Sequence, residues 1–178
     1  MPAKRGIILF VINICFSTVL YAQSKRDSSY IKANEIAHEV VNAMGGLKNF
    51  ANTNYIGWNF FGHRQIIWDK VHNRVRIDFL KEDIIVIAYL HKDEGKLFIN
   101  GEQNTQPDSL KKYINKAQSV WMNDSYWLIM PFKLFDPGVQ LKYLGIAQTM
   151  DSIEANILEL TFDHVGATPE NKYHIYVD

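Results

Sequence analysis

The stretch RVRIDFLKEDIIVIAYL (74–90) decides the fold of this chain. Its first six residues alternate between polar and apolar side chains, which is the two-residue period of a strand with one buried face. Residues 84–90 then form a continuous apolar run of strand length. The four residues between the two segments are too few for a crossover helix, so the two strands are predicted to run antiparallel.

The same pattern continues on both sides of this stretch. Upstream, the side chains of residues 55–61 alternate between two faces from Tyr55 onward, and residues 64–70 place Ile66 and Trp68 on a single side. Downstream, Asp93-Glu94-Gly95 turns the chain into a further strand at residues 96–100. Because every connection is short, the sequence predicts an antiparallel meander.

Helical periodicity precedes the meander. Residues 27–44 carry apolar side chains at spacings of three and four, with Ser28 or Ser29 available as the N-cap. Gly45-Gly46 supplies the left-handed stop that commonly ends a helix. A short second helix is predicted at residues 47–51.

A helical insertion follows the meander. Pro107-Asp108 opens it, with Asp108 as the expected cap, and apolar residues recur at helical spacing as far as Trp121. Asn123-Asp124-Ser125 is expected to restart the chain before the apolar block YWLIMPFKLFDPG (126–138). Pro131 and the Asp-Pro-Gly turn are expected to redirect that block into the sheet.

Further strands are predicted at residues 139–146, 153–162 and 173–177. Helices, strands, a helical insertion and more strands together predict an α+β fold with a single, strongly curved antiparallel sheet. The N-terminal helix and the insertion are expected to cover it. The strand at 173–177 would have one unpaired edge, which favours association between copies of the chain.

The N-terminus has the features of a secretory signal. Lys4 and Arg5 precede an apolar run, and Ala22 offers a small residue for cleavage. We therefore expect residues 1–22 to be removed and residues 23–178 to form one domain in the periplasm or outside the cell. The only cysteine, Cys15, lies within the signal, so the mature chain would contain no disulfide.

Composition excludes several classes of function. The formal net charge is +0, which lacks the basic excess typical of nucleic-acid binders, and 47% hydrophobic residues argue against disorder. The six histidines form no metal pair at helical spacing, although His63 and His72 could approach each other across a hairpin. Phosphate-loop and nucleophile-elbow motifs are absent. The sequence therefore predicts neither an enzyme nor a cofactor.

Carboxylate pairs for acid–base chemistry need only spatial closeness, so the sequence leaves them open. The candidates lie where the outer face of a strand or a turn would place them. They are Asp78, Asp83, Glu154 and Glu159.

Aromatic residues are the unusual feature. All four tryptophans lie between the first strand and the end of the insertion, and such residues form either ordinary core or the lining of an apolar cavity. Residues 126–130 are apolar nearly all round, which predicts burial on more than one side. The residues expected to bind a ligand are Trp58, Phe60, Trp68, Ile77, Phe79, Trp121, Trp127, Met130 and Phe132.

Four segments carry a resemblance to a known family: MGGLKNF (44–50), NDSYWLIMPFKLFDPGV (123–139), LELTF (158–162) and TPENKYHIYVD (168–178). They resemble a family of uncharacterised exported proteins of Bacteroidota, which are similar to the outer-membrane lipoprotein carrier (LolA-like) fold. The resemblance implies a half-open barrel whose hollow face holds acyl chains. It also implies that this chain stops before the last strands of that fold, and the basic residue with which the lipoprotein carrier meets its partner has no match here.

Two functions follow as expectations. The first is a non-enzymatic periplasmic carrier or binding protein that holds a lipid, or the acyl chain of a lipoprotein, in an apolar cavity closed by the YWLIMP segment. The alternative is an envelope domain with a solid core whose partner is another protein, such as an outer-membrane protein.

Overall fold

The computed structural model describes residues 28–166 and 168–178. Their contacts separate into two compact units. Unit 1 contains residues 28–44 and 133–178, and unit 2 contains residues 45–132. The proposed signal at residues 1–22 lies outside the described residues. That residues 23–178 form a single domain, which would contain both units, stays a prediction.

Unit 2 is built on an open six-stranded antiparallel sheet with the order β1-β2-β3-β4-β5-β6. Each strand pairs with its neighbours in the sequence, so the predicted meander is confirmed. The last strand, with three residues, is too short to leave a periodic signal in the sequence. The strands are β1 (Tyr55–Phe60), β2 (Arg64–Asp69), β3 (Arg74–Phe79), β4 (Ile84–Tyr89), β5 (Gly95–Ile99) and β6 (Glu102–Asn104).

The helices of unit 2 are α2 (Gly46–Asn52) and α3 (Pro107–Ile129), and a 3-10 turn, η1 (Met130–Lys133), follows α3. The expected restart at Asn123-Asp124-Ser125 is wrong, because α3 continues through it. Asp124 and Ser125 are buried on the inner side of the helix, and Pro131 is what ends the regular helix.

The expected cap of α3 also needs correction. Gln106 is the N-cap residue and Pro107 is the first helical residue, so Asp108 lies within the first turn. Proline suits this position because its φ angle is already helical and its missing N–H would have no helical partner.

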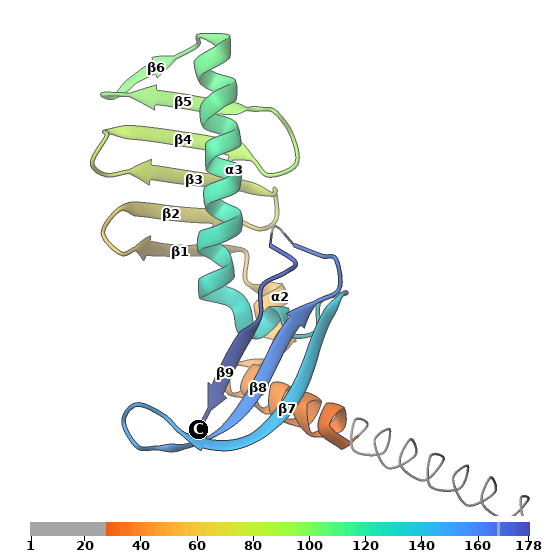
Figure 1. The fold of residues 1–178 in the computed structure, drawn as a ribbon. Coiled ribbons are helices and arrows are strands. Elements are labelled where there is room, and N and C mark those ends of the chain that lie inside the picture. Colours follow the sequence, from red (N-terminus) through yellow and green to blue (C-terminus); the bar gives the residue numbers. More distant parts are fainter. Residues whose placement is uncertain (1–27, 167) are drawn as a thin grey trace, which may run out of the picture. The chain divides into compact units, whose positions relative to one another are not determined.

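The core of unit 2 lies between the sheet and α3, which crosses one face of the sheet (Figure 1). Cross-strand pairing aligns one row of inward side chains across five strands. Its members are Trp58, Ile66, Ile77, Val86 and Leu97. The last four are fully buried, which is the outcome that the two-residue period predicts.

Unit 1 contains a helix at residues 28–43 and a second sheet of order β7-β8-β9, in which β9 is an edge strand. Its strands are β7 (Val139–Gln148), β8 (Glu154–Phe162) and β9 (Tyr173–Val177). The helix packs on this sheet: the Ser29 hydroxyl donates to the carbonyl oxygen of Tyr143 at 2.8 Å. The helix and the sheet both contribute buried apolar side chains, among them Ile36 from the helix and Leu158 from β8.

The expectation of a single sheet is wrong. β7 pairs with neither β6 nor β1 in the part of the chain that is described. The reason lies in α3, which carries the chain from β6 back across the face of the first sheet, so the next strand cannot add beside β6. The two covering helices therefore serve different sheets, the N-terminal helix β7–β9 and α3 β1–β6. No helix in the described ranges is both long and apolar enough to cross a membrane.

Candidate functional site

Helix α3 does not follow the sheet evenly. It lies closest to β3, β4 and β5. At β5 the approach is so tight that a Cβ atom on Gly95 would lie 3.2 Å from the side chain of Ile114. Toward β1 and β2 the space between helix and sheet is filled by large aromatic side chains instead. Helix α3 thus approaches β3, β4 and β5 more closely than it approaches β1 or β2.

These side chains form what we call the aromatic cluster: Trp58, Phe60, Trp68 and Trp121. All four are half-buried and pack against the core. The rings of Trp68 and Trp121 meet edge to face, with centroids 5.1 Å apart. Trp58 lies diagonally across from Trp68, because β1 pairs Trp58 with Ile66, two residues before Trp68.

The three indole N–H groups of the cluster have no hydrogen-bond acceptor. The Nε1 atoms of Trp58, Trp68 and Trp121 are buried, and no described residue accepts a bond from any of them. A buried indole N–H usually finds a partner, and leaving a donor unpaired costs about 1–3 kcal/mol. The cluster therefore has unused donor capacity inside an apolar environment.

Lys70 borders the cluster. Its ammonium lies 3.8 Å from the ring centroid of Phe50 and 5.9 Å from that of Trp68, and it donates to the carbonyl oxygen of Phe50. The Phe50 ring stacks in turn on Phe132, with centroids 4.2 Å apart. Burial lowers the pKa of Lys70. Within the described chain Lys70 is paired with no carboxylate.

An ion pair connects α3 to the sheet beside the cluster. Arg64 donates from Nε to Asp124 at 2.8 Å and from Nη2 at 3.2 Å. Asn123 adds a third hydrogen bond to the same carboxylate at 2.9 Å. The Asp124 side chain is 1% exposed and that of Arg64 is 23% exposed. Both charges are therefore neutralised by each other and are not offered to a ligand.

The structure places the predicted ligand residues in three groups. Ile77 and Phe79 are buried in the core, and the members of the aromatic cluster lie together at its edge. Met130 and Phe132 are half-buried at the end of α3. Trp127 lies apart from these, because its side chain is 62% exposed.

Burial of the whole 126–130 block on more than one side is therefore wrong. The last turns of α3 bury Ser125 and Ile129, which lie four residues apart on one side, and turn Trp127 and Leu128 outward. An apolar composition all round the helix does not prevent one side from facing water.

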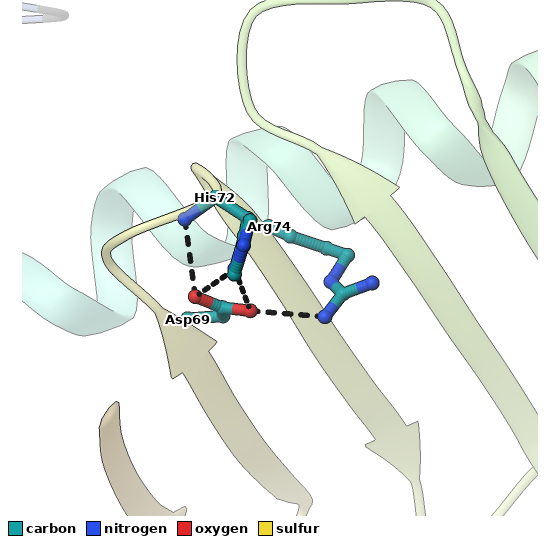
Figure 2. Close-up of polar contacts among 3 residues, drawn as sticks. All are labelled: Asp69, His72 and Arg74. Atoms are coloured by element: carbon teal, nitrogen blue, oxygen red, sulfur yellow. Dashed lines mark hydrogen bonds and ion pairs between the residues drawn. The ribbon is translucent and has the colours of Figure 1, made fainter. Parts of the chain in front are cut away.

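A second polar cluster closes the β2–β3 hairpin (Figure 2). The buried carboxylate of Asp69 accepts from the backbone N–H of His72 at 3.1 Å and from Arg74 Nη2 at 2.9 Å, and the His72 ring Nδ1 lies 2.9 Å from it. Burial raises the pKa of Asp69, but these hydrogen bonds outweigh burial and hold the pKa below its usual value. The cluster is internally satisfied, so we interpret it as a lock on the turn.

Three of the remaining candidates are engaged with other side chains. His72 is engaged with Asp69, Asp78 pairs with Arg76 at 2.7 Å, and Glu159 lies 3.3 Å from Lys172. No group of three or more potential metal ligands occurs in residues 28–166 and 168–178.

Sequence reasoning missed Arg64, Lys70 and Asp124, although a signal for each was present. Arg64 and Lys70 have the same parity as Ile66 and Trp68, so alternation over residues 64–70 places them on the inward side. Asp124 follows Trp121 by three residues, which is the spacing of one helix face. A charge on a buried face requires a partner, and that requirement points to the ion pair.

The chain matches no protein-family model, no curated protein and no solved structure.

Proposed function

We propose that unit 2 binds the acyl part of a lipid or of a lipidated partner at the aromatic cluster, without catalysing a reaction. The observation that carries this proposal is the set of three buried indole N–H groups without an acceptor. A buried donor takes its acceptor from an ordered water or from a ligand. A water needs about two to four polar partners, and the surroundings here are apolar, so an apolar ligand with a few oxygen atoms fits better.

The looser approach of α3 to β1 and β2 supports the same proposal. Aromatic side chains at that end can be displaced or repacked at lower cost than the tight contact at Gly95. In this proposal the six-stranded sheet curves around the acyl chain as a half-open barrel, as the resemblance to the lipoprotein carrier implies. Helix α3 and the inward side of the YWLIMP segment, from which Trp127 points away, act as the lid. The protein works in the periplasm after removal of residues 1–22.

A second candidate function is an envelope protein-interaction domain with a solid core. One observation favours it: Trp127 and Leu128, two large apolar side chains at the end of α3, are both exposed. In that case the aromatic cluster is ordinary core and takes no ligand.

Binding of a fluorescent fatty-acid probe to residues 23–178 distinguishes the two functions, together with native mass spectrometry for co-purified lipid. Trp121→Phe removes one indole N–H and keeps an aromatic ring at this position, and Trp127→Phe, which makes the same change in side-chain volume, is the matched control on the same helix. We expect the wild type to bind the probe, Trp121→Phe to weaken binding roughly three- to tenfold, and Trp127→Phe to leave it unchanged. A folded wild type that binds no probe and carries no lipid would leave the solid-core function standing.

A further inference from the structure

We infer that the ligand is an anionic amphiphile whose carboxylate or phosphate head group pairs with Lys70 while its acyl chain lies on the aromatic cluster. The inference rests on the proposed function and specifies the chemical class of its ligand. It starts from the position of Lys70 at the border of the cluster, 5.9 Å from the ring of Trp68.

The polar groups at this site are donors only. The three indoles each present an N–H and no acceptor, and Lys70 presents an ammonium. The nearby carboxylate of Asp124 accepts from Arg64 and Asn123, so it is engaged. A site of this kind is complementary to a group that only accepts hydrogen bonds, such as a carboxylate or a phosphate.

Lys70 also lacks the partner that a half-buried cation requires. Its charge is offset by the face of the Phe50 ring and by one backbone carbonyl. A cation removed from water is stabilised far better by an anion than by either of these groups. Arg64, a cation at the start of β2, already has Asp124. Lys70 is therefore the cation open to a ligand.

Lys116 provides a matched comparison. Its ammonium lies 4.3 Å from the ring centroid of Phe79, so it too sits over an aromatic ring. Its side chain is exposed, however, and its charge remains hydrated. A head group gains little from such a lysine, because water already solvates it.

The test compares three ligands: cis-parinaric acid, which is a fluorescent fatty acid, its methyl ester, and dodecyl phosphate as a competitor. The proteins are the wild type, Lys70→Gln, Lys70→Arg and Lys116→Gln. We expect the wild type to bind the acid roughly tenfold or more tightly than the ester. Lys70→Gln should remove this difference by weakening acid binding alone, while Lys70→Arg and Lys116→Gln should keep it. If dodecyl phosphate displaces the acid, the site accepts phosphate as well as carboxylate head groups. If it does not, the site accepts carboxylates only.

The outcomes separate this inference from the proposed function. Equal binding of acid and ester by the wild type would overturn the inference and leave acyl binding intact. Binding of neither ligand would overturn both. If Lys70→Gln does not fold, as judged by circular dichroism, the comparison of acid and ester binding in the wild type and in Lys70→Arg still tests the inference.

Discussion

Replacing Asp124 with alanine is predicted to destabilise unit 2 by about 3 kcal/mol. The substitution removes the carboxylate that holds α3 to β2 and leaves the guanidinium of Arg64 without a counterion. Breaking a buried ion pair from one side costs about 3–5 kcal/mol. The lower end applies here, because the Arg64 side chain is 23% exposed and can reach water.

Thermal unfolding followed by tryptophan fluorescence measures this loss, because all four tryptophans lie in unit 2. For a chain of this size 1 kcal/mol corresponds to about 2–4 °C, so we expect the midpoint to fall by about 6–12 °C. Arg76→Ala, which breaks a more exposed pair with Asp78 in the same unit, is the control and should change stability by less than about 1 kcal/mol.

A double replacement tests the reason for the loss. Arg64→Met with Asp124→Leu removes both charges and fills their volume, so it should recover most of the stability lost in Asp124→Ala. A fall of less than about 2 °C in Asp124→Ala would refute the reasoning, because it would mean that the pair is not desolvated.

Three further predictions concern single positions. Gly95→Ala should destabilise unit 2 by about 1–3 kcal/mol in urea unfolding, because the added methyl group would overlap the backbone of the neighbouring strand. Gly57→Ala is the control: its methyl group would make only ordinary contacts, so it should cost less than about 1 kcal/mol. Trp121→Ala should cost about 3–5 kcal/mol and Trp127→Ala less than about 1 kcal/mol; similar losses would contradict their different exposure. Because the pKa of Asp69 is lowered in the folded state, its contacts stabilise the fold above about pH 4, and this stability is lost as pH falls through the folded-state pKa. Asp69→Asn should therefore reduce the loss of stability that the wild type shows on acidification. An unchanged loss of stability in acid would contradict this prediction.

Local patterns in the sequence predicted most of the secondary structure. The strands of the meander followed from side-chain alternation and short polar turns, which are properties of neighbouring residues. The glycines at positions 45 and 46 have φ angles of 96° and 83°, as the predicted helix stop requires. Even the burial of Ile77 and Phe79 could be predicted from their parity.

What could not be predicted depends on contacts between distant residues. The continuity of α3 through Asp124 is supported by a bond to Arg64, sixty positions earlier in the chain. The separation into two sheets depends on the path of α3 across the first sheet, and periodicity contains no information on that path. The exposure of Trp127 likewise depends on which side of the helix meets the sheet.

The stacking of Phe50 on Phe132 has a consequence for how the chain folds. Unit 1 is discontinuous, since unit 2 is inserted between residue 44 and residue 133. Closing a flexible loop of about 80 residues costs roughly 4 kcal/mol of chain entropy. The stacked rings join the two ends of unit 2 at a centroid distance of 4.2 Å, so a folded unit 2 has already met that cost. Because its strands pair only with sequence neighbours, unit 2 can form quickly and early. We therefore expect unit 2 to fold first and to act as the template on which the two segments of unit 1 find each other.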